Sequence, residues 1–294
     1  MPPDPLAYLF PQLEGTDVNS SATKVAIVGI SFIVWSVVFI ICYFVSYHFV
    51  TFRRYLSSKE KVFWCLAIIR ALFGLVSTFF GVWYLAFDST FYDDVVNTLT
   101  VSSFVGLHMG IGFFVLENVA LYASSVLFHS FDRFLAIHHG LSLLGGSIVA
   151  YYGKGHYFAM IGLLLEITTP FSCICWLFIK AKMAHLRIWR INQLILVHLF
   201  HCRTTIEGYL FLKTYFQWDN IWNNMPLPIF ILLYTQLVLQ FFMLTPYWTY
   251  KKMMQLFNPV DWNHPETQNR QVFMNGDVMN GDVRTSKLQY GKQD

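Results

Sequence analysis

Ten ionisable side chains lie inside the most apolar stretches of this chain, and they are the residues that could do chemistry. A charged group at the centre of a membrane helix costs about 2.5–3.5 kcal/mol on insertion scales, so each one needs a partner or a function. Because they fall in five consecutive apolar segments, we expect a helical bundle with a polar interior and outer helices that lack such groups. The ten residues are Arg70, His108, Glu117, His138, His139, Glu166, His198, His201, Arg203 and Glu207.

The first group is the pair His138-His139, near one end of its apolar segment. Adjacent side chains on a helix point about 100° apart, so one imidazole is expected to face a cavity while the other orients a neighbour or a lipid headgroup. Histidine changes charge near neutral pH and can be tuned by a carboxylate, which suits a base or a nucleophile. The alternative is a pair of interfacial histidines at a helix end, and depth alone does not separate the two interpretations.

The second group is Glu166, followed four residues later by Pro170. Proline has no N–H to donate to the carbonyl four residues earlier, here that of Glu166 itself, so we expect a kink and a free carbonyl beside a carboxylate. The hydroxyls of Thr168 and Thr169 can help to satisfy this backbone. A broken, polar helix at this depth favours a carboxylate that lines a cavity. The alternative is a packing kink with a protonated Glu166.

The third group lies in the sixth apolar segment, where two histidines share a helix face and Arg203 is spaced for an ion pair with Glu207. Two histidines and a distant carboxylate can bind zinc or iron in principle, but no HExxH motif is present, and we predict no metal site. A buried ion pair that only fixes packing is the alternative for Arg203 with Glu207, and likewise for Arg70 with Glu117. We predict that five residues contact substrate: Arg70, Glu117, His198, His201 and Arg203.

The elements that position these residues follow from the composition. Of 294 residues, 55% are hydrophobic and 13% are charged, and the mean hydropathy is +0.47. Average soluble domains carry about 25% charged residues, so these values exclude a soluble enzyme, a disordered chain and a secreted disulfide scaffold. The net charge of +3 is too small to indicate nucleic-acid binding, and none of the five cysteines is placed for a lumenal disulfide or a CxxC zinc site.

Seven apolar runs reach the length of about 20 residues that a spanning helix needs. We therefore predict an all-α polytopic membrane bundle over 25–257, preceded by a lumenal segment at 1–24 and followed by a flexible cytosolic tail at 258–294. The first run is too long for a signal-peptide core and is interpreted as a membrane anchor. The predicted spans are 25–50, 62–87, 100–127, 134–152, 156–179, 188–214 and 226–248.

The orientation follows from the basic residues near the ends of the predicted spans. One side receives eleven Lys and Arg residues and the other receives three, Lys24, Lys154 and Lys213. This asymmetry predicts a lumenal N-terminus and a cytosolic C-terminus. The eleven are Arg53, Arg54, Lys59, Lys61, Arg133, Lys180, Lys182, Arg187, Arg190, Lys251 and Lys252.

The order of several motifs resembles the TLC-domain family, which includes the ceramide synthases and the translocating-chain-associated membrane proteins. The motifs are HH at 138–139, GH at 155–156 and E-x-x-x-P-F at 166–171. Three longer blocks, KEKVFW at 59–64, FHCR at 200–203 and PYWTYKKMMQLFNPVDWN at 246–263, resemble one branch of this family. The resemblance covers about 55–263, with the TLC domain at about 62–257. It implies residence in the endoplasmic reticulum with cycling to the ER–Golgi intermediate compartment.

In ceramide synthases the paired histidines act in acyl transfer from acyl-CoA, together with two aspartates of the next span. Here Glu166 takes the place of the first acid, and Thr169 takes that of the second. The missing acid argues against ceramide synthesis and leaves acyl transfer to another lipid. The chain also ends GKQD, without the dilysine retrieval signal of the similar branch.

Two functions are therefore expected. The first is an acyl-CoA-dependent lipid acyltransferase acting in lipid synthesis, sensing or homeostasis, with His138, His139 and Glu166 as catalytic residues, acyl-CoA as co-substrate and no bound cofactor. The alternative is a non-enzymatic cargo receptor that exports lysosomal enzymes from the endoplasmic reticulum to the Golgi, in support of lysosome function. This receptor would bind cargo through its lumenal loops and coat components through its tail. It would need a partner membrane protein, because the predicted lumenal loops are short.

Overall fold

The computed structural model describes residues 17, 20–87, 94–129 and 132–259, and within these ranges every regular element is helical. The predicted N-terminal segment and tail therefore lie almost entirely outside the described residues. The elements are α2 (Ser21–Ser46), η2 (Thr51–Tyr55), α3 (Ser58–Phe87), α5 (Val101–Phe128), α6 (Arg133–Tyr152), α7 (His156–Leu164), η3 (Leu165–Thr168), α8 (Thr169–Lys180), α9 (Arg187–Phe216), α10 (Trp218–Asn224), α11 (Leu227–Leu239), η4 (Gln240–Leu244) and α12 (Thr245–Phe257).

Six helices of the described chain are long and apolar enough to cross a membrane, against seven predicted spans. The remaining predicted span corresponds to α9, which has 30 residues but is more polar than the others. It still runs between the two ends of the bundle. It starts just after the end of α8, and it is followed by α10. The last residue of α10, Asn224, lies next to the loop between α6 and α7, where Lys154 Nζ donates to its carbonyl over 3.1 Å. The all-helical membrane fold is thus confirmed.

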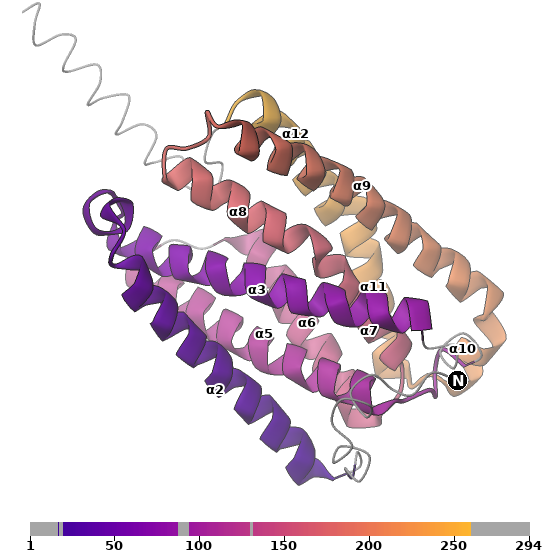
Figure 1. Cartoon of the computed structure of the whole chain (residues 1–294). Helices are drawn as coiled ribbons and strands as arrows, with labels where there is room; N and C mark the ends of the chain where they lie inside the picture. The colour runs from indigo at the N-terminus through magenta and orange to yellow at the C-terminus, as the bar shows by residue number, and fades with distance from the viewer. Residues whose placement is uncertain (1–16, 18–19, 88–93, 130–131, 260–294) are drawn as a thin grey trace, which may run out of the picture. The chain divides into compact units, whose positions relative to one another are not determined.

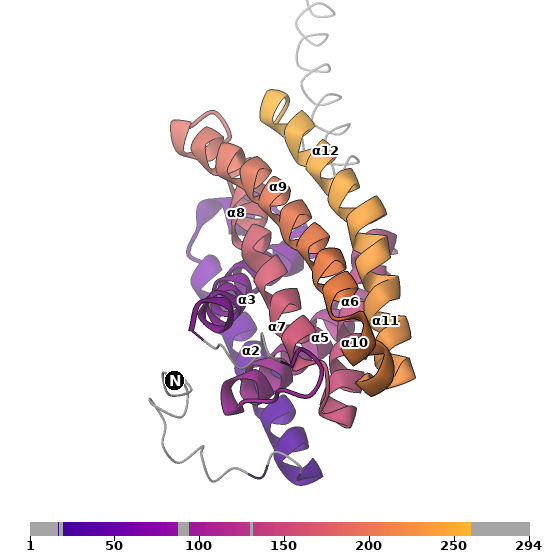
Figure 2. The ribbon, with the colours of Figure 1, turned by 90° about the vertical axis from the view of Figure 1, so that its right-hand side faces the viewer.

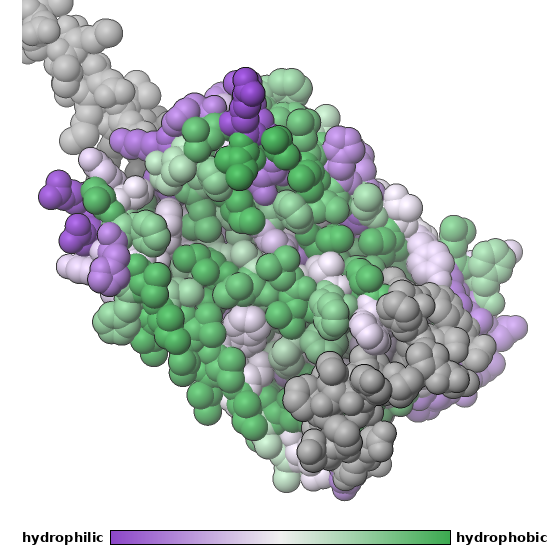
Figure 3. All heavy atoms as spheres, in the orientation of Figure 1, coloured by the Kyte–Doolittle hydropathy of each residue, from purple (hydrophilic) through white to green (hydrophobic). Residues whose placement is uncertain are grey.

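The helices form a bundle in which α2 lies at one side against α3 and α5, and α9 lies with α12 at the other (Figures 1 and 2). Most of the exposed large side chains of α2 are aliphatic, as expected for an outer, lipid-facing helix. On the face shown in Figure 3, hydrophobic residues cover the middle and hydrophilic residues gather towards the ends.

We call the end that contains η2, the starts of α3, α6 and α9, and the ends of α8 and α12 the basic end. All eleven basic residues of the larger predicted set belong to these segments or to the loop after α8. Here Lys180 Nζ forms an ion pair with Glu60 Oε1 at 2.6 Å, which joins α8 to α3. At the opposite end, burial alone would raise the pKa of Asp94, but hydrogen bonds from Asn97, Val96 and Asn220 lower it to about 2.

Close packing between α2 and α5 depends on Gly112. A Cβ built there would lie 2.6 Å from both the Cβ of Ser31 and the carbonyl oxygen of Val28, so only glycine fits. The contact is reinforced by Ser31 Oγ, which donates to the carbonyl of Met109 over 2.8 Å. Small residues let membrane helices approach in this way, and the α2 anchor is fixed against the bundle by it.

We expect Gly112→Val to destabilise the bundle by about 1–3 kcal/mol, because the added methyl groups must push α2 away from α5. Gly29→Val is the matched control, since a Cβ at Gly29 meets nothing within 4 Å. The measurement is the thermal unfolding midpoint of each purified variant in the same detergent. Equal midpoints for the two variants would contradict this account of the contact.

Candidate active site

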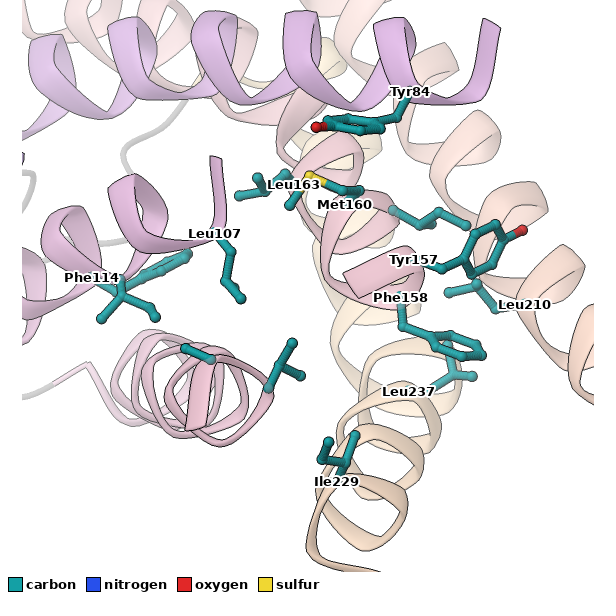
Figure 4. Packing of buried hydrophobic residues seen from close by; sticks show 14 of the residues in the cluster. Tyr84, Leu107, Phe114, Tyr157, Phe158, Met160, Leu163, Leu210, Ile229 and Leu237 are labelled. Atoms are coloured by element: carbon teal, nitrogen blue, oxygen red, sulfur yellow. The ribbon is translucent and has the colours of Figure 1, made fainter. Parts of the chain in front are cut away.

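An elongated cavity of about 120 Å³ lies inside the bundle, between α5, α6, α7, α9 and α11. Along α6 its wall runs from His138 to Val149, which corresponds to about 16 Å of helix. Apolar side chains form most of this wall, and Figure 4 shows several of them converging from α5, α7, α9 and α11. Polar side chains collect towards the basic end. They are His138, Ser142, Glu166, Arg203, Gln236 and Gln240.

His138 and Glu166 meet at this polar end. His138 Nε2 lies 3.8 Å from Glu166 Oε1, an ion-pair distance that is longer than a hydrogen bond. Both residues are at least nine-tenths buried. The ring of Trp248 from α12 packs edge-on against His138, with ring centroids 5.5 Å apart. The structure therefore brings together one predicted catalytic histidine and the predicted carboxylate.

Pro170 explains how Glu166 reaches this position. Because Pro170 lacks an N–H, the carbonyl of Glu166 has no donor four residues ahead, and it accepts from the N–H of Thr169 instead. The result is the single 3₁₀ turn η3 between α7 and α8. The predicted break is present, but the Glu166 carbonyl is not free as we expected. The Thr169 hydroxyl also donates to Glu166 Oε2 over 2.6 Å and orients the carboxylate.

Gln240 contacts the other side of the His138 ring, and it was not predicted from the sequence. The Nε2 of Gln240 lies 3.3 Å from the Nδ1 of His138, so the amide can donate to that ring nitrogen. The other ring nitrogen of His138, Nε2, then carries its proton towards Glu166. Gln240 begins the π-helical turn η4, and such turns occur frequently at functional sites. Gln236, one turn earlier, donates to Ser142 over 3.3 Å. Two glutamines four residues apart in an apolar run were the available signal.

Arg203 reaches the same end of the cavity from α9. Its Nε donates to Glu207 Oε1 over 3.1 Å, as the i, i+4 spacing predicted, and its Nη1 donates to the carbonyl of Leu165 over 3.3 Å. That carbonyl is available because Thr169 bonds to Glu166 rather than to Leu165. Thr245 of α12 donates to the same Glu207 oxygen over 2.8 Å, so the pair is fixed from two helices.

A separate buried cluster contains the second histidine. Arg70 donates to Glu117 Oε2 from Nε over 2.9 Å and from Nη2 over 2.7 Å, which confirms the predicted pair. His139 Nδ1 lies 3.3 Å from the same oxygen. The cluster links α3, α5 and α6, and none of its three members lines the cavity. Adjacent positions on α6 thus send His138 into the cavity and His139 away from it.

The other predicted residues lie elsewhere. His198 and His201 are on the outer face of α9, where each ring Nδ1 contacts a carbonyl of its own helix, so the structure does not bring them to the cavity. His108 is buried in α5, and its Nδ1 contacts the carbonyl of Phe104. Within the described ranges, no three His, Cys, Asp or Glu side chains gather in a way that could hold a metal ion.

Comparison with known proteins agrees with these motifs. The family model for the TLC domain matches residues 63–254. Protein CLN8 of Canis lupus familiaris is 39% identical over 249 residues, which are 84% of this chain and 86% of that protein. Protein CLN8 of Homo sapiens is 37% identical over 258 residues, 86% and 90% of the two chains. No solved structure matches. The three longer blocks had indicated this branch, that of the neuronal ceroid lipofuscinosis type eight protein, and the resemblance is confirmed.

We expect Glu117→Gln to destabilise the bundle by about 3–5 kcal/mol, because it leaves the Arg70 charge buried without a counter-ion. The double variant Arg70→Met/Glu117→Leu should recover most of this loss, since no buried charge remains. Chemical unfolding of the purified proteins in one detergent measures both effects. A single variant as stable as the unchanged protein would show that the pair is not what holds α3 against α5.

Proposed function

Because the chain belongs to the TLC-domain family, in its CLN8 branch, we propose that it is a membrane-embedded enzyme that transfers an acyl group from acyl-CoA to a membrane lipid. The observation that carries this proposal is the His138–Glu166 pair at the polar end of an elongated apolar cavity. A narrow apolar cavity of this kind fits an acyl chain. A histidine beside a carboxylate is suited to proton transfer at the chain's reacting end.

In this proposal His138 is the general base. With Nε2–H directed at Glu166, the lone pair of Nδ1 faces Gln240. The hydroxyl of an acceptor lipid takes the place of the Gln240 amide and gives its proton to Nδ1. Glu166 then stabilises the imidazolium that forms, which is the role of the carboxylate in serine hydrolase triads. His139 faces Glu117 and has no part in this step.

The charge of the bundle ends supports the same arrangement. His138 lies five residues from the start of α6, about 8 Å inside the basic end. We infer from the excess of Lys and Arg that this end faces the cytosol and that the N-terminus is lumenal. The phosphates of coenzyme A are attracted to a basic surface. The thioester can then enter while coenzyme A stays outside the membrane. Residence in the endoplasmic reticulum belongs to this proposal.

A receptor for lysosomal enzymes is the second candidate function, and fewer observations support it. Such a receptor needs a binding surface on the lumenal side, which is the opposite end in this proposal. Of the two connections at that end that are described in full, 153–155 and 217–226, the longer contains only the seven-residue helix α10. A receptor would also leave the buried His138–Glu166 pair without a purpose.

We expect Glu166→Gln to retain abundance and fold and to lower the turnover of acyl transfer by about 10²-fold or more. The amide can still accept from Thr169 and is cheaper to bury than a carboxylate, but it cannot stabilise an imidazolium. The assay follows a labelled acyl group from acyl-CoA into the lipid fraction, with purified protein in vesicles made from endoplasmic reticulum lipids.

Glu60→Gln is the control for this assay, because Glu60 is a buried carboxylate at the basic end and does not line the cavity. The Glu60→Gln variant should transfer the labelled acyl group at the turnover of the unchanged protein. If Glu166→Gln transfers the label at the unchanged rate with normal abundance, the catalytic role of this carboxylate is wrong.

A further inference from the structure

Arg203 lines the polar end of the cavity, and one of its hydrogen-bond donors is unused. Its Nε and Nη1 are occupied by Glu207 and by the carbonyl of Leu165, but no group in the described part of the chain accepts from Nη2. The residue is only 3% exposed, so water at the protein surface does not serve this nitrogen. Buried donors without an acceptor are rare, and a charged one needs an explanation. A ligand in the cavity supplies one.

The charges around Arg203 decide what kind of ligand oxygen fits. Glu207 already neutralises the guanidinium at 3.1 Å, and its second oxygen, Oε2, also has no partner in the described structure. Glu166 adds a second carboxylate, which lines the cavity together with Arg203. One arginine and two carboxylates therefore lie at this end of the cavity, so it carries no excess positive charge. A phosphate there would be repelled, whereas an uncharged carbonyl oxygen can accept from Nη2.

The surroundings hold this donor in one place. Thr245 hydrogen-bonds the Glu207 carboxylate, and the guanidinium lies 5.9 Å from the ring centre of Trp248. Trp248 also packs against His138. The donor and the base are thus positioned around the same end of one cavity by side chains from α9 and α12. Donors fixed before the reaction stabilise a developing charge without the energy of rearrangement.

We propose that Nη2 of Arg203 donates a hydrogen bond to the carbonyl oxygen of the bound acyl thioester and stabilises the oxyanion formed from it. The inference rests on the proposed function and specifies the group that Arg203 recognises, an acyl carbonyl. The remaining acyl chain occupies the apolar part of the cavity.

The proposed reaction transfers the acyl group from the thioester sulfur to the oxygen of the acceptor hydroxyl. The acceptor hydroxyl gives its proton to Nδ1 of His138, and its oxygen forms a bond to the thioester carbon, so that the C=O electron pair moves onto the carbonyl oxygen facing Arg203. The tetrahedral intermediate then collapses, the C–S bond breaks, and the departing thiolate takes the proton from the imidazolium. An ester and free coenzyme A result, and the protein is unchanged.

The test compares Arg203→Gln/Glu207→Gln with Glu207→Gln. The double variant removes both charges of this pair and keeps an amide for Thr245, which protects the fold, and its thermal midpoint checks this. The single variant retains the guanidinium without its counter-ion and is expected to be less stable, so its spectrum is recorded below its own thermal midpoint. The probe is palmitoyl-CoA with a ¹³C label at the carbonyl carbon, bound without acceptor lipid to the full chain in detergent. Infrared spectroscopy then reports on the carbonyl, because a hydrogen bond to its oxygen lowers the stretching frequency.

We expect a lowered carbonyl frequency in the unchanged protein and in Glu207→Gln, and the frequency of free thioester in the double variant. In the transfer assay the double variant should lose about 10²–10³-fold in kcat with little change in KM, as for other oxyanion donors. A purely structural Arg203 would leave the carbonyl frequency unchanged by the substitutions.

The outcomes separate this inference from the proposed function. The role of Arg203 is overturned if palmitoyl-CoA binds but its carbonyl frequency is not lowered in the unchanged protein. It is also overturned if the frequency stays lowered in the double variant. Either result leaves acyl transfer standing. Failure of palmitoyl-CoA to bind to the unchanged protein overturns the proposed function and the role of Arg203 together.

Discussion

Charged side chains inside an apolar bundle must find partners within it, and this constraint organises the structure. Three such groups lie among the described residues: Arg70–Glu117–His139, His138–Glu166 and Arg203–Glu207. The first joins α3, α5 and α6, and the second joins α6 to η3. The third is anchored to α12 through Thr245. A loss of the carboxylate charge in either arginine group leaves a buried guanidinium uncompensated, so these contacts fix the packing around the site.

Two departures from regular α-helix lie next to the same histidine. The 3₁₀ turn η3 presents Glu166 to one nitrogen of His138, and the π turn η4 presents Gln240 to the other. Distorted backbone at membrane depth is tolerated where it is buried in protein or lines a cavity, and both turns meet this condition. The η3 turn has a second effect, because it frees the Leu165 carbonyl for Arg203. A single proline therefore shapes the positions of both a carboxylate and a guanidinium.

Local rules predicted a large part of this site. The i, i+4 spacing of Arg203 and Glu207, the break before Pro170 and the divergence of His138 from His139 all follow from helix geometry. Gln240 was missed because two amides in an apolar run carry little signal until their helix is placed against α6. His198 and His201 share a helix face as predicted, but sequence spacing does not tell which face of α9 meets the bundle. That choice depends on contacts between segments far apart in the chain.

Acyl transfer at His138 requires that the cavity holds an acyl chain with its reacting end at this histidine. The most direct measurement is the acyl-chain length that is transferred by Ala159→Phe, a substitution in the cavity wall about 10 Å along α7 from Glu166. Leu144→Phe, on the exposed face of α6, is its control. The account predicts that Ala159→Phe shifts transfer from long to shorter acyl chains, while Leu144→Phe leaves the preference unchanged. An unaltered length preference in Ala159→Phe, with transfer retained, would contradict it.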